Sequence, residues 1–278
     1  MRVTVFGASG LLGKVLIRDW SQDEVAGLSS GDVDIRDADK VSQIVGRTRP
    51  DWIVVTAAYT DVDGCETNKD MAFSVNRDAV VNVAEAAKQV GARLLFLSSD
   101  YVFDGKKASP YETGDARNPQ SIYGCSKAEA EVRLLNVLPE VCIVRTSWLF
   151  GVGGKCFPDT ILKLAASRPA LDVVEDQRGS PTYTVDLATA IIQLCRKGAQ
   201  GILHVTNSGD CTWFEFARAI IKGAGLDTEV RPVSTQQMSR PAQRPAYSVL
   251  SGRSLLPYGI AMPSWQDALQ RYLHERKS

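Results

Sequence analysis

The chain has 278 residues, of which 44% are hydrophobic and 23% are charged, a composition typical of a globular protein with a substantial core. Its 32 basic and 32 acidic residues cancel, so neither a nucleic-acid nor a membrane partner is expected. No apolar run approaches the roughly 20 residues that cross a bilayer. The N-terminus lacks the pattern of a signal peptide, so a cytoplasmic protein is expected.

The first half of the chain alternates short apolar runs with helical patterns. Strands are predicted at 3–6, 24–28, 52–58, 93–99 and 141–148, and helices at 11–20, 37–48, 69–90 and about 120–137. Strands that are apolar on both faces and separated by helices indicate a parallel sheet covered on both sides. We therefore predict an α/β fold with a doubly wound, Rossmann-type parallel sheet.

After about residue 149 the pattern becomes irregular and is punctuated by glycine and proline. Helices are predicted at about 184–197 and 212–224, with one strand at 202–206. We expect two lobes: a dinucleotide-binding lobe of residues 1–148 plus about 184–206, and a small mixed substrate-binding lobe of about 149–183 plus 207–278. The ligand is expected between them, at the carboxyl ends of the strands.

A glycine-rich loop, "FGASGLLG", follows the first predicted strand and runs into an apolar helix. Gly7 allows a tight turn, Gly10 lets backbone approach a pyrophosphate, and Gly13 lets the helix pack closely on the sheet. The helix N-terminus adds N–H groups for the phosphates. A lone glycine triplet is weak evidence, but this one has the strand–turn–helix context of a dinucleotide site.

The end of the second predicted strand is where NADH and NADPH are usually distinguished. An acidic residue there would bind the ribose hydroxyls of NADH, yet the sequence reads "GLSSGDVDIRD", with no carboxylate before Asp32. No arginine stands at the strand end to bind a 2′-phosphate either. The sequence therefore permits both NADPH and NADH.

Tyr123 and Lys127 are four residues apart in "SIYGCSKA", near the start of a predicted helix, and so lie on one helix face. For a phenol to act near pH 7, its pKa must fall by about three pH units, roughly 4 kcal/mol. A nearby ammonium group, with the positive ring of an oxidised nicotinamide, is the kind of cause that lowers it. This spacing is common by chance, but "RLLFLSSDYVFDG" places Ser98, Ser99 and Asp100 at the same edge of the sheet.

The glycine loop, Ser99, Tyr123 and Lys127 together resemble the extended short-chain dehydrogenase/reductases. More narrowly, the chain resembles the dTDP-4-dehydrorhamnose reductase family over nearly its whole length. The matching stretches are "FGASGLLG", "TAAYTDVDGCE", "VN" at 75–76, "LSSDYVFDG", "PYET", "NPQSIYGCSKAEAE", "RTSWLFG", "DQRGSPTY", "HVTNSG", "WFEFARAI" and "RPAYSVLS".

The resemblance implies a role for each matching residue. Tyr123 would donate a proton to the C4 ketone, Lys127 would tune Tyr123 and hold the nicotinamide ribose, and Ser99 would bond the reacting oxygen. The implied cofactor-binding residues, besides Tyr123 and Lys127, are Gly7, Ser9, Gly10, Leu11, Leu12, Gly13, Asp34, Ile35, Ala57, Ala58, Tyr59 and Ser98. The implied substrate-binding residues are Asp100, Tyr101, Val102, Trp148, Gln177, Pro181, Thr182, Arg240 and Arg244.

For three of these residues a role outside the substrate site also stays open. Trp148 fits a buried strand end as well as a sugar-binding wall. Arg240 and Arg244 fit solvated loop charges as well as phosphate ligands, because the flanking prolines fix neither side chain's direction.

The resemblance implies reduction of dTDP-4-dehydrorhamnose by NADPH or NADH, and two departures bear on it. Related dehydratases use a glutamate where this chain has Tyr101, so the base for elimination is missing. Val15 stands where some relatives carry a glutamate for Mg²⁺, so no metal is predicted. The open alternatives are a reductase for another nucleotide sugar and a non-catalytic subunit like the β-subunit of methionine adenosyltransferase. A homodimer is also left open.

Overall fold

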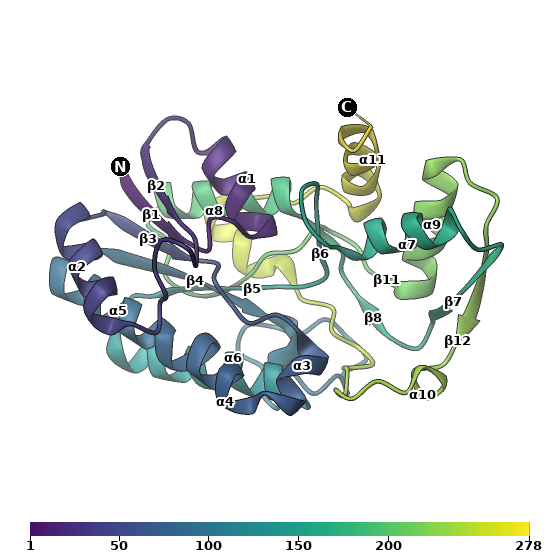
Figure 1. Cartoon of the computed structure of the whole chain (residues 1–278), viewed down its shortest axis with the longest axis horizontal. Helices are drawn as coiled ribbons and strands as arrows, with labels where there is room; N and C mark the ends of the chain where they lie inside the picture. Colours follow the sequence, from purple (N-terminus) through teal and green to yellow (C-terminus); the bar gives the residue numbers. More distant parts are fainter. Residues whose placement is uncertain (278) are drawn as a thin grey trace.

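The computed structural model describes residues 1–277. Six strands form one sheet in which every neighbouring pair is parallel. The predicted doubly wound parallel sheet is therefore confirmed (Figure 1). In spatial order the strands are β10 (Gly201–His204), β5 (Cys142–Thr146), β4 (Arg93–Ser99), β3 (Trp52–Val55), β1 (Arg2–Phe6) and β2 (Glu24–Leu28).

Helices cover both faces of this sheet (Figure 1). Successive residues of a strand point to opposite faces, and β3 illustrates this: Trp52 and Val54 belong to one apolar cluster, Ile53 and Val55 to the other. Because both faces are buried, the strands are apolar without interruption. One face is covered by α1 (Leu11–Asp19) and α8 (Thr184–Arg196), the other by α2 (Ala38–Thr48), α5 (Ala79–Val90) and α6 (Ile122–Val137).

The strand order reverses beside β1, because the chain passes from β1 to β2 on one side and then to β3 on the other. At this point the loops after β1 and β3 meet, and the Ala57 N–H donates to the Phe6 carbonyl over 3.0 Å. Such a switch point leaves a crevice at the carboxyl ends of the strands, where ligands bind in open α/β sheets.

The segment predicted as one long helix, residues 69–90, contains a π-helical turn. It consists of α4 (Lys69–Phe73), the turn η1 (Ser74–Asp78) and α5, and a short helix missed by the pattern, α3 (Val62–Thr67), precedes it. Asn76 in η1 is fully buried. Its side chain accepts from the Tyr59 N–H over 2.7 Å and donates to the Ser126 hydroxyl over 3.0 Å. The π-turn thus ties the loop after β3 to α6, a common use of such bulges at functional sites.

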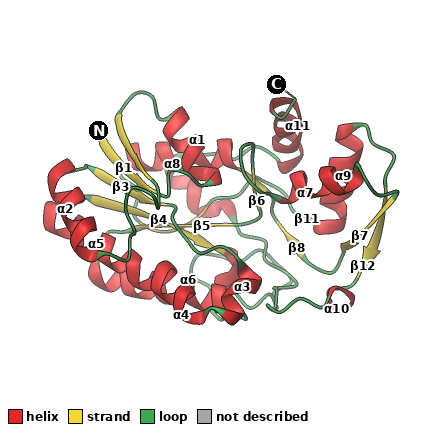
Figure 2. Cartoon of the chain, in the orientation of Figure 1, coloured by secondary structure: helices red, strands yellow, loops and turns green. Residues whose placement is uncertain are grey.

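The C-terminal part from Leu149 on, apart from α8 and β10, packs beside the carboxyl edge of the sheet around a third apolar cluster that includes Phe150, Phe216 and Tyr272 (Figure 2). Its strands pair two by two: β6 (Leu149–Phe150) with β9 (Thr182–Tyr183), β7 (Ala170–Val174) with β12 (Glu229–Val233), and β8 (Arg178–Gly179) with β11 (Cys211–Thr212). Its helices are α7 (Phe157–Ala165), α9 (Trp213–Ala224), α10 (Thr235–Met238) and α11 (Trp265–Glu275).

One C-terminal segment packs on the sheet. The 3₁₀ helix η3 (Gly252–Tyr258) contributes Leu255 to the apolar cluster under α1 and α8, and Ile260 follows it there. This segment was assigned to the substrate-binding lobe, but Leu255 and Ile260 are buried against the sheet, whereas Leu256 between them is exposed. Within residues 1–277, no helix has the length and apolar character that crossing a membrane requires.

Candidate active site

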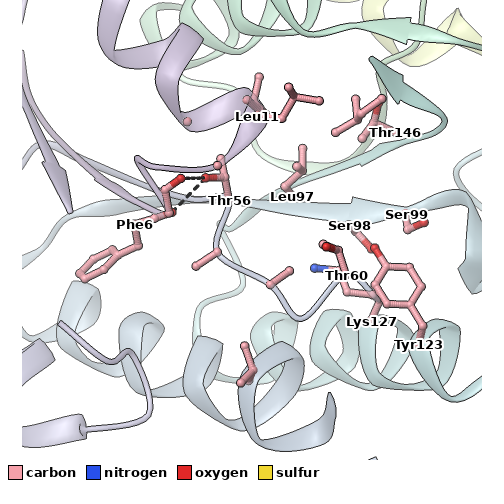
Figure 3. Close-up of a pocket in the computed structure, with 18 of the residues that line it drawn as sticks. Phe6, Leu11, Thr56, Thr60, Leu97, Ser98, Ser99, Tyr123, Lys127 and Thr146 are labelled. Atoms are coloured by element: carbon pink, nitrogen blue, oxygen red, sulfur yellow. Dashed lines mark hydrogen bonds between the residues drawn. The ribbon is translucent and has the colours of Figure 1, made fainter. Parts of the chain in front are cut away.

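A cavity of about 930 Å³ opens at the carboxyl edge of the sheet, where the strand order reverses. Most of the site residues predicted from the sequence line it (Figure 3). They are Gly7, Ser9, Gly10, Leu11, Leu12, Gly13, Asp34, Ile35, Ala57, Ala58, Ser98, Ser99, Asp100, Tyr101, Tyr123, Lys127 and Trp148.

The glycine loop has the close packing that a dinucleotide-binding turn requires. Gly7 has a φ of +96°, and a Cβ atom there would lie 2.5 Å from the Ala57 nitrogen. A Cβ atom at Gly13 would lie 2.1 Å from the Gly7 carbonyl oxygen. Gly10 caps α1 without a side-chain hydrogen bond, so the first N–H groups of the helix face the cavity free of a competing side chain.

The loop after β2 brings a charged pair to the cavity. Asp34 and Arg36 both line it, and the Arg36 Nε donates to the Asp34 carboxylate over 2.9 Å. This hydrogen bond lowers the pKa of Asp34. The sequence interpretation found no arginine for a 2′-phosphate at the strand end. The structure adds that Arg36, from a position further along the loop, lines the cavity.

Ser99, Tyr123 and Lys127 converge on the same part of the cavity from two elements (Figure 3). Ser99 ends β4, and its hydroxyl donates to Asp100 over 2.9 Å. Tyr123 and Lys127 lie one turn apart in α6, whose first turn is capped by the Ser121 hydroxyl. A helix that begins just before Tyr123 therefore aims both side chains at the strand end.

Burial dominates the pKa values in this group. Burial raises the pKa of Tyr123 above its usual value; a hydrogen bond with Ser99 opposes the rise and the charge of Asp100 adds to it. Burial lowers the pKa of Lys127 to about 7, against the pull of Glu131. In the ligand-free protein burial, and not Lys127, dominates the pKa of the phenol. The expectation that Lys127 lowers this pKa together with an oxidised nicotinamide concerns the cofactor complex and stays a prediction.

Aromatic and acidic side chains complete the wall next to Tyr123. The ring of Tyr101 meets that of Tyr123 edge to face, with centroids 5.6 Å apart. Burial raises the pKa of Asp100 to about 6, and its Oδ2 atom has no hydrogen-bond partner among the described residues. Such a buried acceptor is suited to a ligand hydroxyl.

Trp148 lines the cavity with its backbone in the left-handed region, at φ +48°. For a bulky residue this conformation costs about 1–3 kcal/mol and persists only where the surroundings enforce it. The indole of Trp213, at the start of α9, stacks on it with centroids 3.5 Å apart. Trp213 was missed from the sequence because only the fold brings α9 to the cavity. The available signal was that Trp213 begins "WFEFARAI", one of the stretches that match the family.

Several predicted site residues do not line the cavity. Val102 lies in the 3₁₀ helix η2 (Asp100–Val102) and is fully buried in an apolar cluster with Phe103. Tyr59 is held by Asn76 through its backbone. The others outside the lining are Gln177, Pro181, Thr182, Arg240 and Arg244.

The excluded polar residues have partners within the protein. Gln177 donates to the Thr235 hydroxyl over 2.8 Å, and Thr182 is fully buried in β9. Arg244 forms two hydrogen bonds with Asp63, and Arg240 lies 3.6 Å from the same carboxylate. The two arginines therefore face an acidic side chain in this structure.

Among residues 1–277, no group of three or more histidine, cysteine, aspartate or glutamate side chains is arranged to hold a metal ion. Val15, which stands where a metal-binding glutamate was considered, lies on the buried face of α1.

A glycine loop at the switch point, with hydroxyl, phenol and amine at the adjoining strand end, defines a dinucleotide-binding protein of the short-chain dehydrogenase/reductase type. The model of the RmlD substrate binding domain matches residues 1–278. The chain belongs to that family.

Known relatives match the chain from end to end. The spore coat polysaccharide biosynthesis protein SpsK of Bacillus subtilis is 43% identical over 100% of this chain and 98% of its own. The crystal structure of a dTDP-4-dehydrorhamnose reductase from Clostridium acetobutylicum superposes with a TM-score of 0.97, at 36% identity, with full coverage of both chains. The Bacillus anthracis dTDP-4-dehydrorhamnose reductase, solved in complex with NADP, has a TM-score of 0.96 and 39% identity, with 99% of each chain covered.

Proposed function

We propose that this protein reduces the C4 ketone of dTDP-4-dehydro-6-deoxy-L-mannose (dTDP-4-dehydrorhamnose) to dTDP-L-rhamnose, with NADPH or NADH as reductant. The observation that carries the proposal is the convergence of Ser99, Tyr123 and Lys127 in one cavity with the glycine loop. Two structural relatives that match the chain almost completely are named as reductases of this substrate.

The residues at the switch point fit a nicotinamide dinucleotide. Gly7 and Gly13 leave no room for a side chain, and the open N-terminus of α1 suits a pyrophosphate. Arg36 offers a cation to a 2′-phosphate and Asp34 an acceptor to the adenosine. The bound nicotinamide would supply the hydride. Lys127, at the floor of the same cavity, would hold the nicotinamide ribose.

The proton that completes the reduction would come from Tyr123. Because burial keeps the pKa of its phenol high, Tyr123 carries its proton at neutral pH, as a donor to a developing alkoxide must. The Ser99 hydroxyl would bond the same oxygen and orient the ketone. Asp100, Tyr101 and Trp148 would contact the sugar from the adjoining wall.

Residues outside the cavity lining keep their proposed roles only if the C-terminal part closes over the nucleotide. Gln177, Pro181 and Thr182 would then approach the sugar, and Arg240 or Arg244 would exchange Asp63 for the substrate's phosphates. We also propose the division into a dinucleotide-binding and a substrate-binding lobe, with the segment around Leu255 and Ile260 packed on the former. A cytoplasmic location belongs to the same proposal.

The decisive experiment measures NADPH and NADH oxidation with a panel of 4-keto nucleotide sugars. We expect turnover with dTDP-4-dehydrorhamnose above all others. Preference for another sugar would favour the alternative of a different 4-ketoreductase. Absence of turnover with every sugar would favour a non-catalytic subunit.

Tyr123→Phe tests the proton donor directly. Loss of the phenol should lower kcat by about 100-fold or more, because a positioned general acid contributes roughly 10²–10⁴, while the Kd for NADPH stays within about twofold. Tyr258→Phe, a change in η3 outside the cavity, serves as the control. An unchanged kcat in Tyr123→Phe would remove this residue from the proposal.

A further inference from the structure

Two tryptophans from different parts of the chain form one wall of the cavity. The indole rings of Trp148 and Trp213 are nearly parallel, at 8°, with centroids 3.5 Å apart, and both side chains line the cavity that contains Tyr123. Trp148 follows β5 of the main sheet, whereas Trp213 is the first residue of α9. The stack therefore connects the sheet edge that carries the reactive groups to the C-terminal part of the protein.

Trp148 is held in its left-handed conformation by contacts on several sides. Its carbonyl accepts the Thr182 N–H over 3.1 Å, which fixes the backbone. Below the indole lies Gly179, where a Cβ atom would come within 2.6 Å of the Trp148 Cε2 atom. Any side chain at that position would displace the ring, so the glycine is required by the position of the indole.

Trp213 is itself firmly placed. Thr212 caps α9, and its side chain and that of Glu215 form a reciprocal capping box. Phe157 packs on the indole of Trp213, with centroids 4.5 Å apart. In the β8–β11 pair Cys211 lies opposite Gly179, so Trp213 and the glycine under Trp148 are carried by one small rigid unit.

We propose that Trp213 is a positioning residue for the sugar of the nucleotide-sugar substrate, acting by holding the Trp148 indole as an apolar wall of the site. The inference rests on the proposed function, since it assumes a 6-deoxy sugar as the ligand. Such a sugar carries a methyl group where the parent hexose has a hydroxymethyl group, and a stacked indole pair offers that methyl group an apolar, rigid surface. Both side chains remain partly exposed, toward the cavity that they line.

Isothermal titration with two stable nucleotides isolates the sugar contribution. The wild type, Trp213→Ala and Trp213→Phe are each titrated with dTDP-L-rhamnose and with dTDP. We expect Trp213→Ala to weaken dTDP-L-rhamnose binding by about tenfold and dTDP binding by less than about twofold. Trp213→Phe keeps an aromatic face against Trp148 and should recover most of the affinity.

Phe214→Ala is the matched control, because it removes the neighbouring aromatic side chain of α9, which does not line the cavity. Near-ultraviolet circular dichroism supplies a second readout: a signal from coupled indoles should be present in the wild type and absent from both Trp213 variants. Equal weakening of dTDP and dTDP-L-rhamnose in Trp213→Ala, or affinity equal to that of the wild type, would overturn the inference.

Failure of the proposed function is seen separately. If the wild type binds dTDP-L-rhamnose but oxidises no NADPH with dTDP-4-dehydrorhamnose, the reductase assignment fails. The role of Trp213 is then still decided by how much more Trp213→Ala weakens the binding of dTDP-L-rhamnose than that of dTDP. If the wild type turns over but Trp213→Ala binds dTDP-L-rhamnose as tightly as the wild type, only the role of Trp213 fails.

Discussion

Lys127 and Tyr123 are shifted in opposite directions by the same cause. Each loses hydration in the cavity floor, and desolvation disfavours whichever form is charged. The pKa of the phenol rises and that of the amine falls to about 7. The Lys127 Nζ also lies 4.0 Å from the centroid of the Phe96 ring, which compensates only part of the lost hydration. The ligand-free protein therefore holds a protonated phenol beside a half-ionised amine.

This arrangement predicts that Lys127 destabilises the free protein. Its pKa is near 10.5 in the unfolded chain and about 7 in the folded protein, so the unfolded state binds more protons between these values. Below pH 7 Lys127 therefore lowers the free energy of unfolding by its full amount, which is at most about 5 kcal/mol. This effect disappears as the pH rises toward 10.5. Lys127→Met should raise the free energy of unfolding at pH 6 and abolish turnover.

Urea denaturation of both proteins at pH 6 and pH 9, without cofactor, measures this effect. The stability gain of Lys127→Met should shrink by about 1.4 kcal/mol for each pH unit above 7. A gain that does not depend on pH would indicate better packing of methionine as the cause. A loss of stability would contradict the prediction.

The helix α6 is the element that organises the reactive groups. Glu131, one turn beyond Lys127, is fully buried. It accepts hydrogen bonds from the Ser98 hydroxyl over 2.6 Å, from Arg145 Nη2 over 2.6 Å and from Arg117 over 3.1 Å. Burial alone would raise the pKa of Glu131, but the hydrogen bonds and charge of Arg145 keep it below its usual range. The carboxylate thereby fastens α6 to β4 and β5, on which Ser99 and Trp148 depend.

Glu131→Gln is expected to lower the free energy of unfolding by about 3–5 kcal/mol, because it leaves the buried Arg145 guanidinium without its counter-charge. Chemical denaturation at pH 7 measures this difference. Glu129→Gln provides the control on the same helix: Glu129 pairs with Arg77 at the surface, and its loss should cost less than about 1 kcal/mol. Similar effects in both variants would contradict a central role for Glu131.

At the scale of the whole molecule, the sequence was most informative where local spacing decides position. Gly7, Tyr123 and Lys127 could be placed because a strand–turn–helix and a four-residue helical spacing set their directions within a few residues. The parallel sheet followed from strands that are apolar on both faces. The π-turn at Asn76 was invisible because it changes the helical period by one residue only.

Long-range packing was the part that the sequence could not resolve. Trp213 reaches the cavity only through the β8–β11 pair, and Arg36 only through the course of the loop after β2. Val102 follows two residues that line the cavity, but the turn of η2 directs it into the core. Partners from distant elements decide such side-chain directions, and no local pattern records them.

Asp63 and Arg244 are 181 residues apart in sequence and form an ion pair. The position of the C-terminal loop, residues 240–246, depends on this pair. The Arg244 guanidinium donates to both oxygens of Asp63, over 3.1 and 2.9 Å, and is only 13% exposed. The Ala242 N–H donates to the same carboxylate. Bidentate, partly buried pairs of this kind hold a loop more firmly than surface ion pairs.

Asp63→Asn should therefore loosen residues 240–246 without unfolding the sheet. We expect the free energy of unfolding to fall by about 1–2 kcal/mol and hydrogen exchange in this segment, first at the Ala242 amide, to accelerate by about tenfold.

The hydrogen bond with Arg244 holds the pKa of Asp63 below its usual range. The contribution of this carboxylate to stability is therefore full above about pH 4 and is lost as the pH falls further. The difference in free energy of unfolding between wild type and Asp63→Asn should accordingly shrink at about pH 3. Asp70→Asn, which changes an exposed residue of α4, controls for the loss of one negative charge. If hydrogen exchange at residues 240–246 were equally fast in Asp70→Asn, the Asp63–Arg244 pair would not be what holds the loop.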